Sequence, residues 1–280
     1  MNQDAQIYNS LLPILIVNVS FIIIFMYYAV TFQFKEKTPE AKERLHTSFL
    51  GVFFREFWYW FIDPIVKTLI FLRITPNIIT SASIVLSIFT GYLFFIGEIA
   101  WAGWFVIISG NMDLLDGRVA RVTGNTTLSG GFYDACVDRY NDAFVFMGLG
   151  LYFVGKNFTL SKSVVTITTL DLIMLAVVFM TIIGSSITSY SKARGEAMGY
   201  TTKRGLMQRP ERIVMLGIFS IIDPWFKIIA SKYNLYPDSM LICVIILMAI
   251  LVNYSGIIRI VVLFKDIKKD DPPKGQLKNT

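Results

Sequence analysis

Four aspartates are grouped within residues 110–140 of a chain that is otherwise mostly apolar. Asp113 and Asp116 are three residues apart, and Asp134 and Asp138 are four apart, so each pair shares one face of a helix. Carboxylates that converge in this way repel one another unless cations lie between them. Carboxylate oxygens favour Mg²⁺ or Mn²⁺, often together with a phosphate-bearing substrate. The spacing therefore predicts a site for two divalent cations.

The residues between the two pairs favour such a site. The segment TGNTTLSGG predicts a short turn between antiparallel helices, whose carboxylates then meet across one gap. Gly117 and Ala120 leave room for a planar group near the backbone, and Arg121 can hold a phosphate bidentately. The alternative is that the aspartates lie at the water interface and pair with nearby arginines, namely Arg118, Arg121 and Arg139.

The composition predicts that membrane helices carry these residues. Hydrophobic residues make up 54% of the 280 positions, charged residues make up 16%, and the mean hydropathy is +0.57. A backbone in lipid is satisfied only in helices or closed barrels, and no alternating strands are visible in the sequence. We expect an all-α integral membrane protein. It should have a six-helix transmembrane core, preceded by an interfacial amphipathic helix and one extra N-terminal transmembrane helix.

The hydropathy pattern places the spans, which need about 20 apolar residues each. The predicted spans are 11–32, 77–96, 100–122, 130–154, 166–190, 212–229 and 239–264. The first is too long for a signal peptide, and no basic residue precedes it. We expect four sections: an N-terminal helix and polar linker in 1–45, the interfacial helix in 46–75, the membrane domain in 76–265 and a polar tail in 266–280.

Charged loops predict the orientation in the membrane. Lysines and arginines are concentrated after the first span, before the sixth span and in the tail, whereas the opposite loops hold few. The basic side faces the cytoplasm in most membrane proteins, and the turn between the aspartate pairs lies on that side. The net charge of +6 has the same explanation, so we expect no nucleic-acid partner.

Cysteine and histidine are scarce. Cys136 and Cys243 cannot form a disulfide framework, and both fit as small apolar residues in helices. The single histidine, His46, lies in a polar stretch. Acid–base chemistry based on histidine is therefore not expected, and any general base must be another type of residue.

The segments DLLDGRVAR and GGFYDACVD fit the pattern D-x-x-D-G-x-x-A-R, eight further residues, then G-x-x-x-D-x-x-x-D. This pattern resembles the signature of the CDP-alcohol phosphotransferases, also called CDP-alcohol phosphatidyltransferases. Fixed positions at fixed spacing make the resemblance specific, and it covers about residues 76–264. The matching positions are Asp113, Asp116, Gly117, Ala120, Arg121, Gly130, Asp134 and Asp138. The N-terminal span departs from the six-span plan of this family.

The resemblance implies an enzyme of phospholipid biosynthesis. In such a reaction an acceptor hydroxyl displaces CMP from a CDP-linked lipid such as CDP-diacylglycerol. By match, four aspartates would bind Mg²⁺ or Mn²⁺ (two ions), namely Asp113, Asp116, Asp134 and Asp138, and Asp138 would also act as the catalytic base. The predicted CDP-lipid pocket consists of Asn77, Ile78, Ile79, Thr80, Gly117, Arg121 and Thr127.

A basic stretch between the fifth and sixth spans bears on the acceptor. The segments SKARGEAMG and GLMQRPERIV resemble the inositol-phosphate-using branch of the family, which includes phosphatidylinositol-phosphate synthases and archaeal ether-lipid counterparts. The resemblance implies an acceptor-phosphate site made by Lys192, Arg194, Arg209, Arg212 and Arg259. Arg259 could instead extend towards the membrane interface, and the loop charges also serve as an ordinary topology signal.

Inositol 1-phosphate is therefore the acceptor that we expect, with glycerol 3-phosphate or serine as alternatives for the same chemistry. A non-catalytic membrane-binding relative is a further alternative, although the complete aspartate set is evidence against it. A cation-coupled transporter would need carboxylates near mid-membrane and inverted repeats, and the sequence shows no repeat. The resemblance also implies a homodimer in the cell inner membrane or its equivalent, with the active site facing the cytoplasm.

Overall fold

The structure is a computed structural model of the chain, and it describes residues 3–31, 52–156, 158–159, 164–165, 167–202 and 204–270. Within these ranges the fold is all-helical apart from two paired two-residue strands. The helices are α1 (Gln3–Thr31), α3 (Val52–Phe71), α4 (Pro76–Phe95), α5 (Ile99–Thr123), α6 (Leu128–Gly155), α7 (Thr169–Ala197), α8 (Arg209–Lys232) and α9 (Ser239–Asp270). Strands β1 (Phe158–Thr159) and β2 (Val164–Val165) pair antiparallel between α6 and α7.

Local sequence signals set the helix ends around the aspartates. Helix α5 ends at Thr123, and the next residue, Gly124, has a φ of 68°, in the left-handed region that glycine adopts without strain. The Asn125 N–H then closes the helix by donating to the Ala120 carbonyl oxygen at 2.9 Å. Thr127 caps α6, since its hydroxyl accepts from the Gly130 N–H at 3.0 Å. The chain therefore reverses within a few residues, as the sequence predicts.

The two helices that carry the aspartates are not close neighbours along their length. Helix α4 packs extensively against both α5 and α6, whereas α5 and α6 contact each other only briefly. The two helices therefore share no long interface, although carboxylates from both converge near the turn, as predicted. Helix α4 fills the space between them because its Gly91 meets Gly148 of α6 backbone to backbone. A Cβ atom on Gly148 would overlap the Gly91 backbone.

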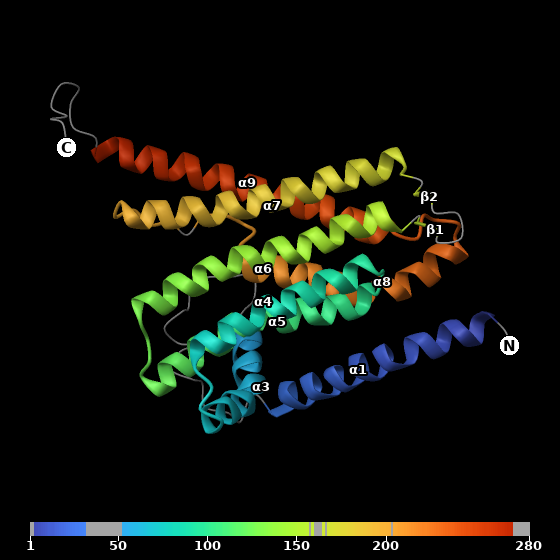
Figure 1. The fold of residues 1–280 in the computed structure, drawn as a ribbon, viewed down its shortest axis with the longest axis horizontal. Helices are drawn as coiled ribbons and strands as arrows, with labels where there is room; N and C mark the ends of the chain where they lie inside the picture. Colours follow the sequence, from blue (N-terminus) through green and yellow to red (C-terminus); the bar gives the residue numbers. More distant parts are fainter. Residues whose placement is uncertain are drawn as a thin grey trace.

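A second close crossing holds α8 against α5. A Cβ atom on Gly103 would lie 2.7 Å from the carbonyl oxygen of Gly217, so only glycine fits there. The remaining major contact joins α7 to α9, and α6 links that pair to α4 (Figure 1). The result is a bundle in which the start of α8 lies beside the aspartate-bearing ends of α5 and α6.

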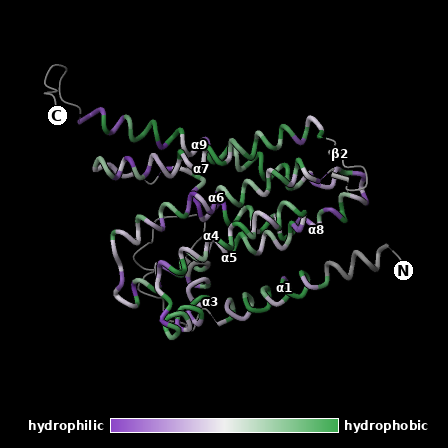
Figure 2. Tube along the Cα trace, viewed as in Figure 1, coloured by the Kyte–Doolittle hydropathy of each residue, from purple (hydrophilic) through white to green (hydrophobic). Residues whose placement is uncertain are grey.

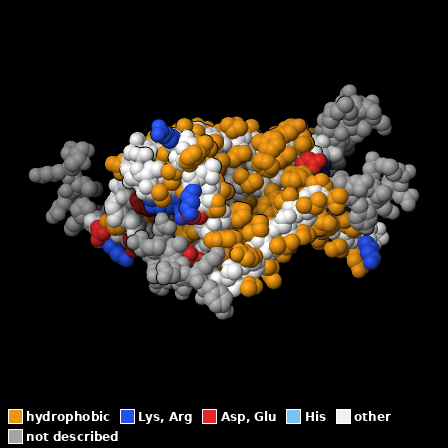
Figure 3. Space-filling model, turned by 90° about the horizontal axis from the view of Figure 1, so that it is seen from below, with side chains coloured by type: hydrophobic (Ala, Val, Ile, Leu, Met, Phe, Trp, Pro, Cys, Tyr) orange, Lys and Arg blue, Asp and Glu red, His pale blue; other side chains and the backbone are white. Residues whose placement is uncertain are grey.

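The bundle is an integral membrane protein. Five described helices are long and apolar enough to cross a membrane: α1, α4, α7, α8 and α9. Helices α5 and α6 fall below that hydropathy because charged residues interrupt them, and Figure 2 shows hydrophilic stretches where they approach the turn between them. Hydrophobic side chains cover much of the visible face in Figure 3, and charged side chains gather mainly towards the ends.

Helix α1 lies along the edge of the bundle and α3 runs across one end of it (Figure 1). Aromatic rings join them, and the centroids of Phe25 and Phe57 are 5.0 Å apart. The other face of α3 packs Tyr59, Ile62 and Val66 against α4 and α5. The interfacial helix was expected over 46–75; the described helix is shorter, and residues 32–51 lie outside the described ranges.

A second charged group lies at the opposite end of the bundle, near β1 and β2. We call it the distal cluster; it consists of Tyr152, Lys156, Asp171, Asp223, Lys227 and Asp238. Lys156 pairs with Asp171 at 3.3 Å and with Asp238 at 3.2 Å. Lys227 pairs with Asp223 at 2.9 Å and with Asp238 at 3.2 Å. These contacts tie the ends of α6, α7 and α8 to the connection before α9.

Candidate active site

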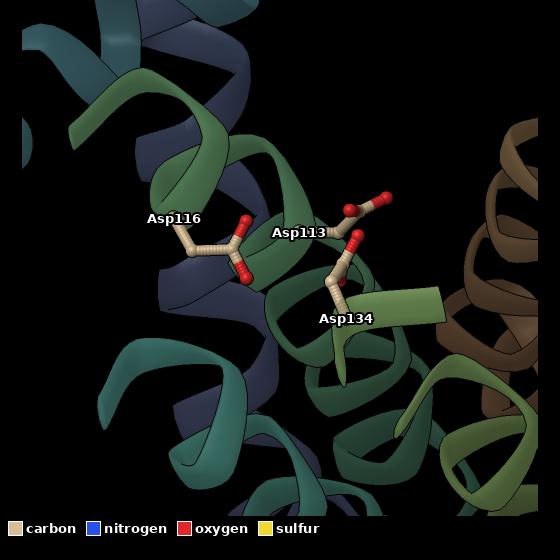
Figure 4. Close-up of side chains that lie close together, drawn as sticks. All are labelled: Asp113, Asp116 and Asp134. Atoms are coloured by element: carbon tan, nitrogen blue, oxygen red, sulfur yellow. The ribbon is translucent and has the colours of Figure 1, made fainter. Parts of the chain in front are cut away.

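Three of the four predicted aspartates come together. Asp113 and Asp116 from α5 and Asp134 from α6 each offer one carboxylate oxygen, and these oxygens lie within 4.8 Å of one another. Figure 4 shows the three side chains meeting where the first turns of α6 pass the end of α5. Oxygen ligands at this spacing suit a hard divalent cation. The donor set therefore fits the predicted metal.

Asp116 is the most enclosed member of the group. It is 6% exposed, and it accepts a hydrogen bond of 2.5 Å from the hydroxyl of Thr80. Thr80 lies in the first turns of α4, which begins with Pro76 at a position that suits proline. Helix α4 therefore orients Asp116 and also places the Asn77–Thr80 segment beside the carboxylates.

Asp138 lies one helical turn beyond Asp134 and forms an ion pair with Arg209. The guanidinium Nη1 of Arg209 is 2.8 Å from Asp138 Oδ1 and 3.0 Å from Asp113 Oδ2. Arg209 is the first residue of α8, so the start of this helix reaches the carboxylates directly. Asp138 is thus separate from the three converging oxygens, and its predicted contact with a metal ion stays a prediction.

One residue near the site was not identified from the sequence. Asp142, one turn after Asp138, accepts hydrogen bonds of 2.7 Å from both Arg212 Nη2 and the Ser185 hydroxyl. Its other oxygen is 3.7 Å from Nε of Arg209. The sequence pattern that indicates Asp142 is the four-residue spacing of Asp134, Asp138 and Asp142, which places all three on one face of a predicted membrane helix.

The alternative pairing of the aspartates with Arg118, Arg121 and Arg139 is not what the structure contains. Arg118 turns towards α3, where it donates to the Tyr59 carbonyl oxygen at 2.9 Å and to Asp63 at 3.2 Å. Arg139 donates to the carbonyl oxygen of Ala135 on its own helix. Among the described residues, the arginines paired with these aspartates come from α8.

The predicted CDP-lipid residues surround the first turn of α4 and the ends of α5 and α6. Ile79 is only 3% exposed and packs with Leu115 and Val119, so it supports the fold rather than facing a ligand. Others are accessible: Asn77, Ile78, Arg121 and Thr127. Gly117 lies under Arg121, and a Cβ atom there would be 3.2 Å from the Arg121 guanidinium. Their binding roles stay predictions.

The predicted acceptor residues fall into three environments. Lys192 and Arg194 are exposed near the end of α7, and Lys192 is 3.9 Å from Glu196. Arg209 and Arg212 point into the protein among the α6 carboxylates. Arg259 is 4% exposed and donates to the Thr188 carbonyl oxygen at 2.7 Å and to that of Arg204 at 3.3 Å. Arg259 thus joins α9 to α7 and the following loop.

Comparisons with known proteins agree with this geometry. The family model for CDP-alcohol phosphatidyltransferase matches residues 73–265. The chain is 32% identical over 163 residues to archaetidylinositol phosphate synthase of Pyrococcus horikoshii, covering 58% of this chain and 77% of the relative. It is 32% identical over 155 residues to phosphatidylinositol phosphate synthase of Corynebacterium glutamicum, covering 55% of this chain and 66% of the relative.

The fold also has a solved counterpart. The crystal structure of Mycobacterium tuberculosis phosphatidylinositol phosphate synthase in complex with manganese and citrate aligns with a TM-score of 0.60 at 23% identity. The alignment covers 78% of this chain and 92% of that one. The family match spans well over half of the sequence and contains all four predicted metal ligands. The chain belongs to the CDP-alcohol phosphatidyltransferase family.

Proposed function

We propose that the protein transfers a phosphatidyl group from a CDP-linked lipid, CDP-diacylglycerol, to the hydroxyl of inositol 1-phosphate and releases CMP. The observation that carries the proposal is the convergence of Asp113, Asp116 and Asp134 one turn away from Asp138 and Arg209. Such an arrangement places a cation site next to a carboxylate and a guanidinium. It matches a reaction between a diphosphate and an anionic alcohol.

The donor set supports the binding of Mg²⁺ or Mn²⁺, as two ions shared among Asp113, Asp116, Asp134 and Asp138. One of the solved relatives was crystallised with manganese, and another structure of the same protein has CDP-diacylglycerol bound. When bound, the cations would neutralise the diphosphate and stabilise the charge on the leaving CMP. Thr80 would keep Asp116 oriented towards them.

Asp138 is the proposed general base. It takes the proton from the acceptor hydroxyl as that oxygen forms a new bond to the lipid-linked phosphorus. The bond from this phosphorus to the CMP oxygen breaks, and CMP leaves with the electron pair. Arg209, 2.8 Å from Asp138 Oδ1, favours the ionised form of that carboxylate before the proton moves.

The acceptor assignment depends on the cations beside this base. A phosphorylated acceptor brings about two negative charges, which need more than one cation nearby. Arg209 and Arg212 supply two guanidinium groups on the face of α6 that carries Asp138. Lys192 and Arg194 complete the proposed set, whereas Arg259 bonds the carbonyl oxygens of Thr188 and Arg204 and supports the loop before α8. The relatives named archaetidylinositol phosphate synthase and phosphatidylinositol phosphate synthase support the same acceptor class.

A panel of acceptors tests this assignment. Purified protein with CDP-diacylglycerol and Mg²⁺ would be given inositol 1-phosphate, glycerol 3-phosphate, serine or free inositol, with CMP release as the measurement. We expect inositol 1-phosphate to support turnover and free inositol and serine to fail. The Asp113→Asn variant provides the background rate. Faster turnover with glycerol 3-phosphate or serine would assign the protein to another acceptor branch.

We also propose a homodimer in the cell inner membrane or its equivalent, with the carboxylates on the cytoplasmic side. The basic residues near the α5–α6 turn support this orientation through the positive-inside rule. Labelling of single cysteines placed at Lys265 and Lys232 in intact cells would test the orientation. Light scattering of the detergent-purified protein would give the oligomeric state. We expect an impermeant reagent to label the cysteine at position 232 and not the one at position 265. Labelling at position 265 alone would show the opposite orientation.

A further inference from the structure

Asp142 lies where α6, α7 and α8 meet, next to the proposed acceptor site but outside the aspartate pattern of the family. It is one helical turn from Asp138, and its side chain is 20% exposed. Ser185 of α7 donates to the same Asp142 oxygen that Arg212 of α8 contacts, each at 2.7 Å. The carboxylate is therefore fixed from two helices and has a defined direction.

The two arginines on α8 need this negative charge. Arg209 and Arg212 are three residues apart, so they share one face at the N-terminal end of the helix. Cations are unfavourable there because the helix dipole is positive at that end. The Arg212 side chain is only 4% exposed, and among the described residues Asp142 is its hydrogen-bonding partner. Without Asp142 it would be a buried charge with no counterion.

Asp142 also lies beside Arg209, the arginine that pairs with the proposed base Asp138. Asp142 Oδ1 lies 3.7 Å from Nε of Arg209, while Nη1 of the same guanidinium reaches Asp138. One edge of Arg209 thus lies within ion-pair distance of Asp142 without a hydrogen bond, and the other edge contacts the carboxylates of Asp113 and Asp138. A small cavity of about 20 Å³ borders Asp138, Asp142, Ser185 and Arg209.

We propose that Asp142 is a positioning residue that holds the guanidinium groups of Arg212 and Arg209 in place to receive the phosphate of the acceptor. The inference rests on the proposed function, because it requires an acceptor that carries an anionic group. Asp142 itself would not contact the reacting atoms. Its effect should therefore appear in acceptor binding, with donor binding and metal dependence unchanged.

The test is steady-state kinetics of Asp142→Asn with the acceptor that the wild-type protein uses. We expect the acceptor KM to rise roughly tenfold to a hundredfold, because a charge-assisted contact is lost. The KM for CDP-diacylglycerol should stay within about twofold and kcat within about threefold. Asp223→Asn, a buried aspartate of the distal cluster, is the matched control and should leave both KM values unchanged.

A double-mutant cycle shows whether Asp142 acts through the arginine. If it does, the acceptor KM of Asp142→Asn combined with Arg212→Ala should rise by clearly less than the product of the two separate fold-changes, and only the part of the effect that acts through Arg209 should remain. If the fold-change in acceptor KM of the double variant equalled the product of the two single fold-changes, the inference would be overturned. An unchanged acceptor KM in Asp142→Asn would also overturn it. If that variant does not fold, Asp142→Glu replaces it, with an expected KM increase of about threefold to tenfold and an unchanged KM as the contrary result.

The outcome for the proposed function is read separately, in the wild-type protein. If the wild-type protein uses glycerol 3-phosphate, the proposed acceptor is wrong. The Asp142 inference is then tested by the ratio of the glycerol 3-phosphate KM in Asp142→Asn to that in the wild type. A wild-type preference for an uncharged acceptor overturns both, because no phosphate would then need the arginines. If the wild-type protein uses inositol 1-phosphate but the acceptor KM of Asp142→Asn is unchanged, only the Asp142 inference is overturned.

Discussion

The distal cluster and the aspartates near the α5–α6 turn lie at opposite ends of the bundle and contain similar residues, but their charges are paired differently. In the distal cluster, three aspartates face two lysines, and each aspartate has a lysine nitrogen within 3.3 Å. Near the α5–α6 turn, five aspartates including Asp142 face two arginines of α8. Among the described residues, Asp116 and Asp134 have no cation within ion-pair distance.

This difference separates a structural group of charges from a functional one. The distal aspartates are 0 to 6% exposed, and each is paired with a lysine of the protein, which links the helix ends. The carboxylates near the turn are left with excess negative charge that must be balanced from outside. Buried or half-buried charges that the protein does not balance itself mark a place where a cation or a charged substrate binds.

Removal of divalent metal should give the largest difference between the two ends. Excess EDTA should abolish CMP release, a fall of roughly a thousandfold or more, because no protein cation replaces the metal at Asp116 and Asp134. Added Mg²⁺ or Mn²⁺ should restore the rate. The measurement is CMP release at saturating substrates, and near-full activity in EDTA would show that the unmatched carboxylates serve another purpose.

Loss of the proposed base should have the next largest effect. Asp138→Asn should reduce kcat roughly a hundredfold to a thousandfold, because an amide cannot take the acceptor proton. Nucleotide binding, measured with labelled CDP-diacylglycerol, should remain within about threefold of wild type. Asp113→Asn is the companion variant and should weaken metal and nucleotide binding as well. A near-wild-type kcat in Asp138→Asn would remove Asp138 from the base role.

Loss of a site arginine should affect one substrate only. Arg209→Ala should raise the acceptor KM roughly tenfold to a hundredfold, because a charge-assisted hydrogen bond contributes about 1.5–3 kcal/mol. The KM for CDP-diacylglycerol should change little. Lys232→Ala, an exposed cation at the distal end, is the control and should leave both constants as they are. An equal change in both KM values would mean that Arg209 supports the whole site.

A distal substitution should change stability and leave the reaction almost untouched. Asp223→Asn should lower the free energy of unfolding by about 1–3 kcal/mol, because Lys227 loses a fully buried partner. The rate of CMP release should stay within about twofold. Thermal unfolding in detergent measures the first quantity. Lys67→Ala, at an exposed pair, should cost less than about 0.5 kcal/mol, and equal losses would contradict the structural role of the distal cluster.

The sequence was sufficient for the helices and for the chemistry of the turn. Apolar stretches of about 20 residues predict membrane helices because the bilayer sets their length. Gly124 and Thr127 act through neighbouring backbone atoms, so their effect on the turn is visible in the sequence. The carboxylate spacing likewise follows from the helical repeat. These features depend on local geometry, and the structure agrees with them.

Contacts between distant segments were not predictable in the same way. The interposition of α4 between α5 and α6 depends on the meeting of Gly91 and Gly148, which are far apart in sequence. The pairing of Asp142 with Arg212 joins α6 to α8, and no local pattern identifies a partner 70 positions away. Arg259 was read as a site residue or an interfacial one, whereas it bonds carbonyl oxygens of α7 and the next loop.

The low hydropathy of α5 and α6 has a consequence for biogenesis. An aspartate or arginine at the centre of a helix costs about 2.5–3.5 kcal/mol when that helix enters the bilayer alone, and α5 carries Asp113, Asp116, Arg118 and Arg121. Helices α5 and α6 are therefore less favourable in the bilayer than the apolar helices around them. Helix α4 is apolar, is synthesised first and packs against both of them. It can serve as the intramolecular partner that retains the two charged helices in the membrane until α8 arrives.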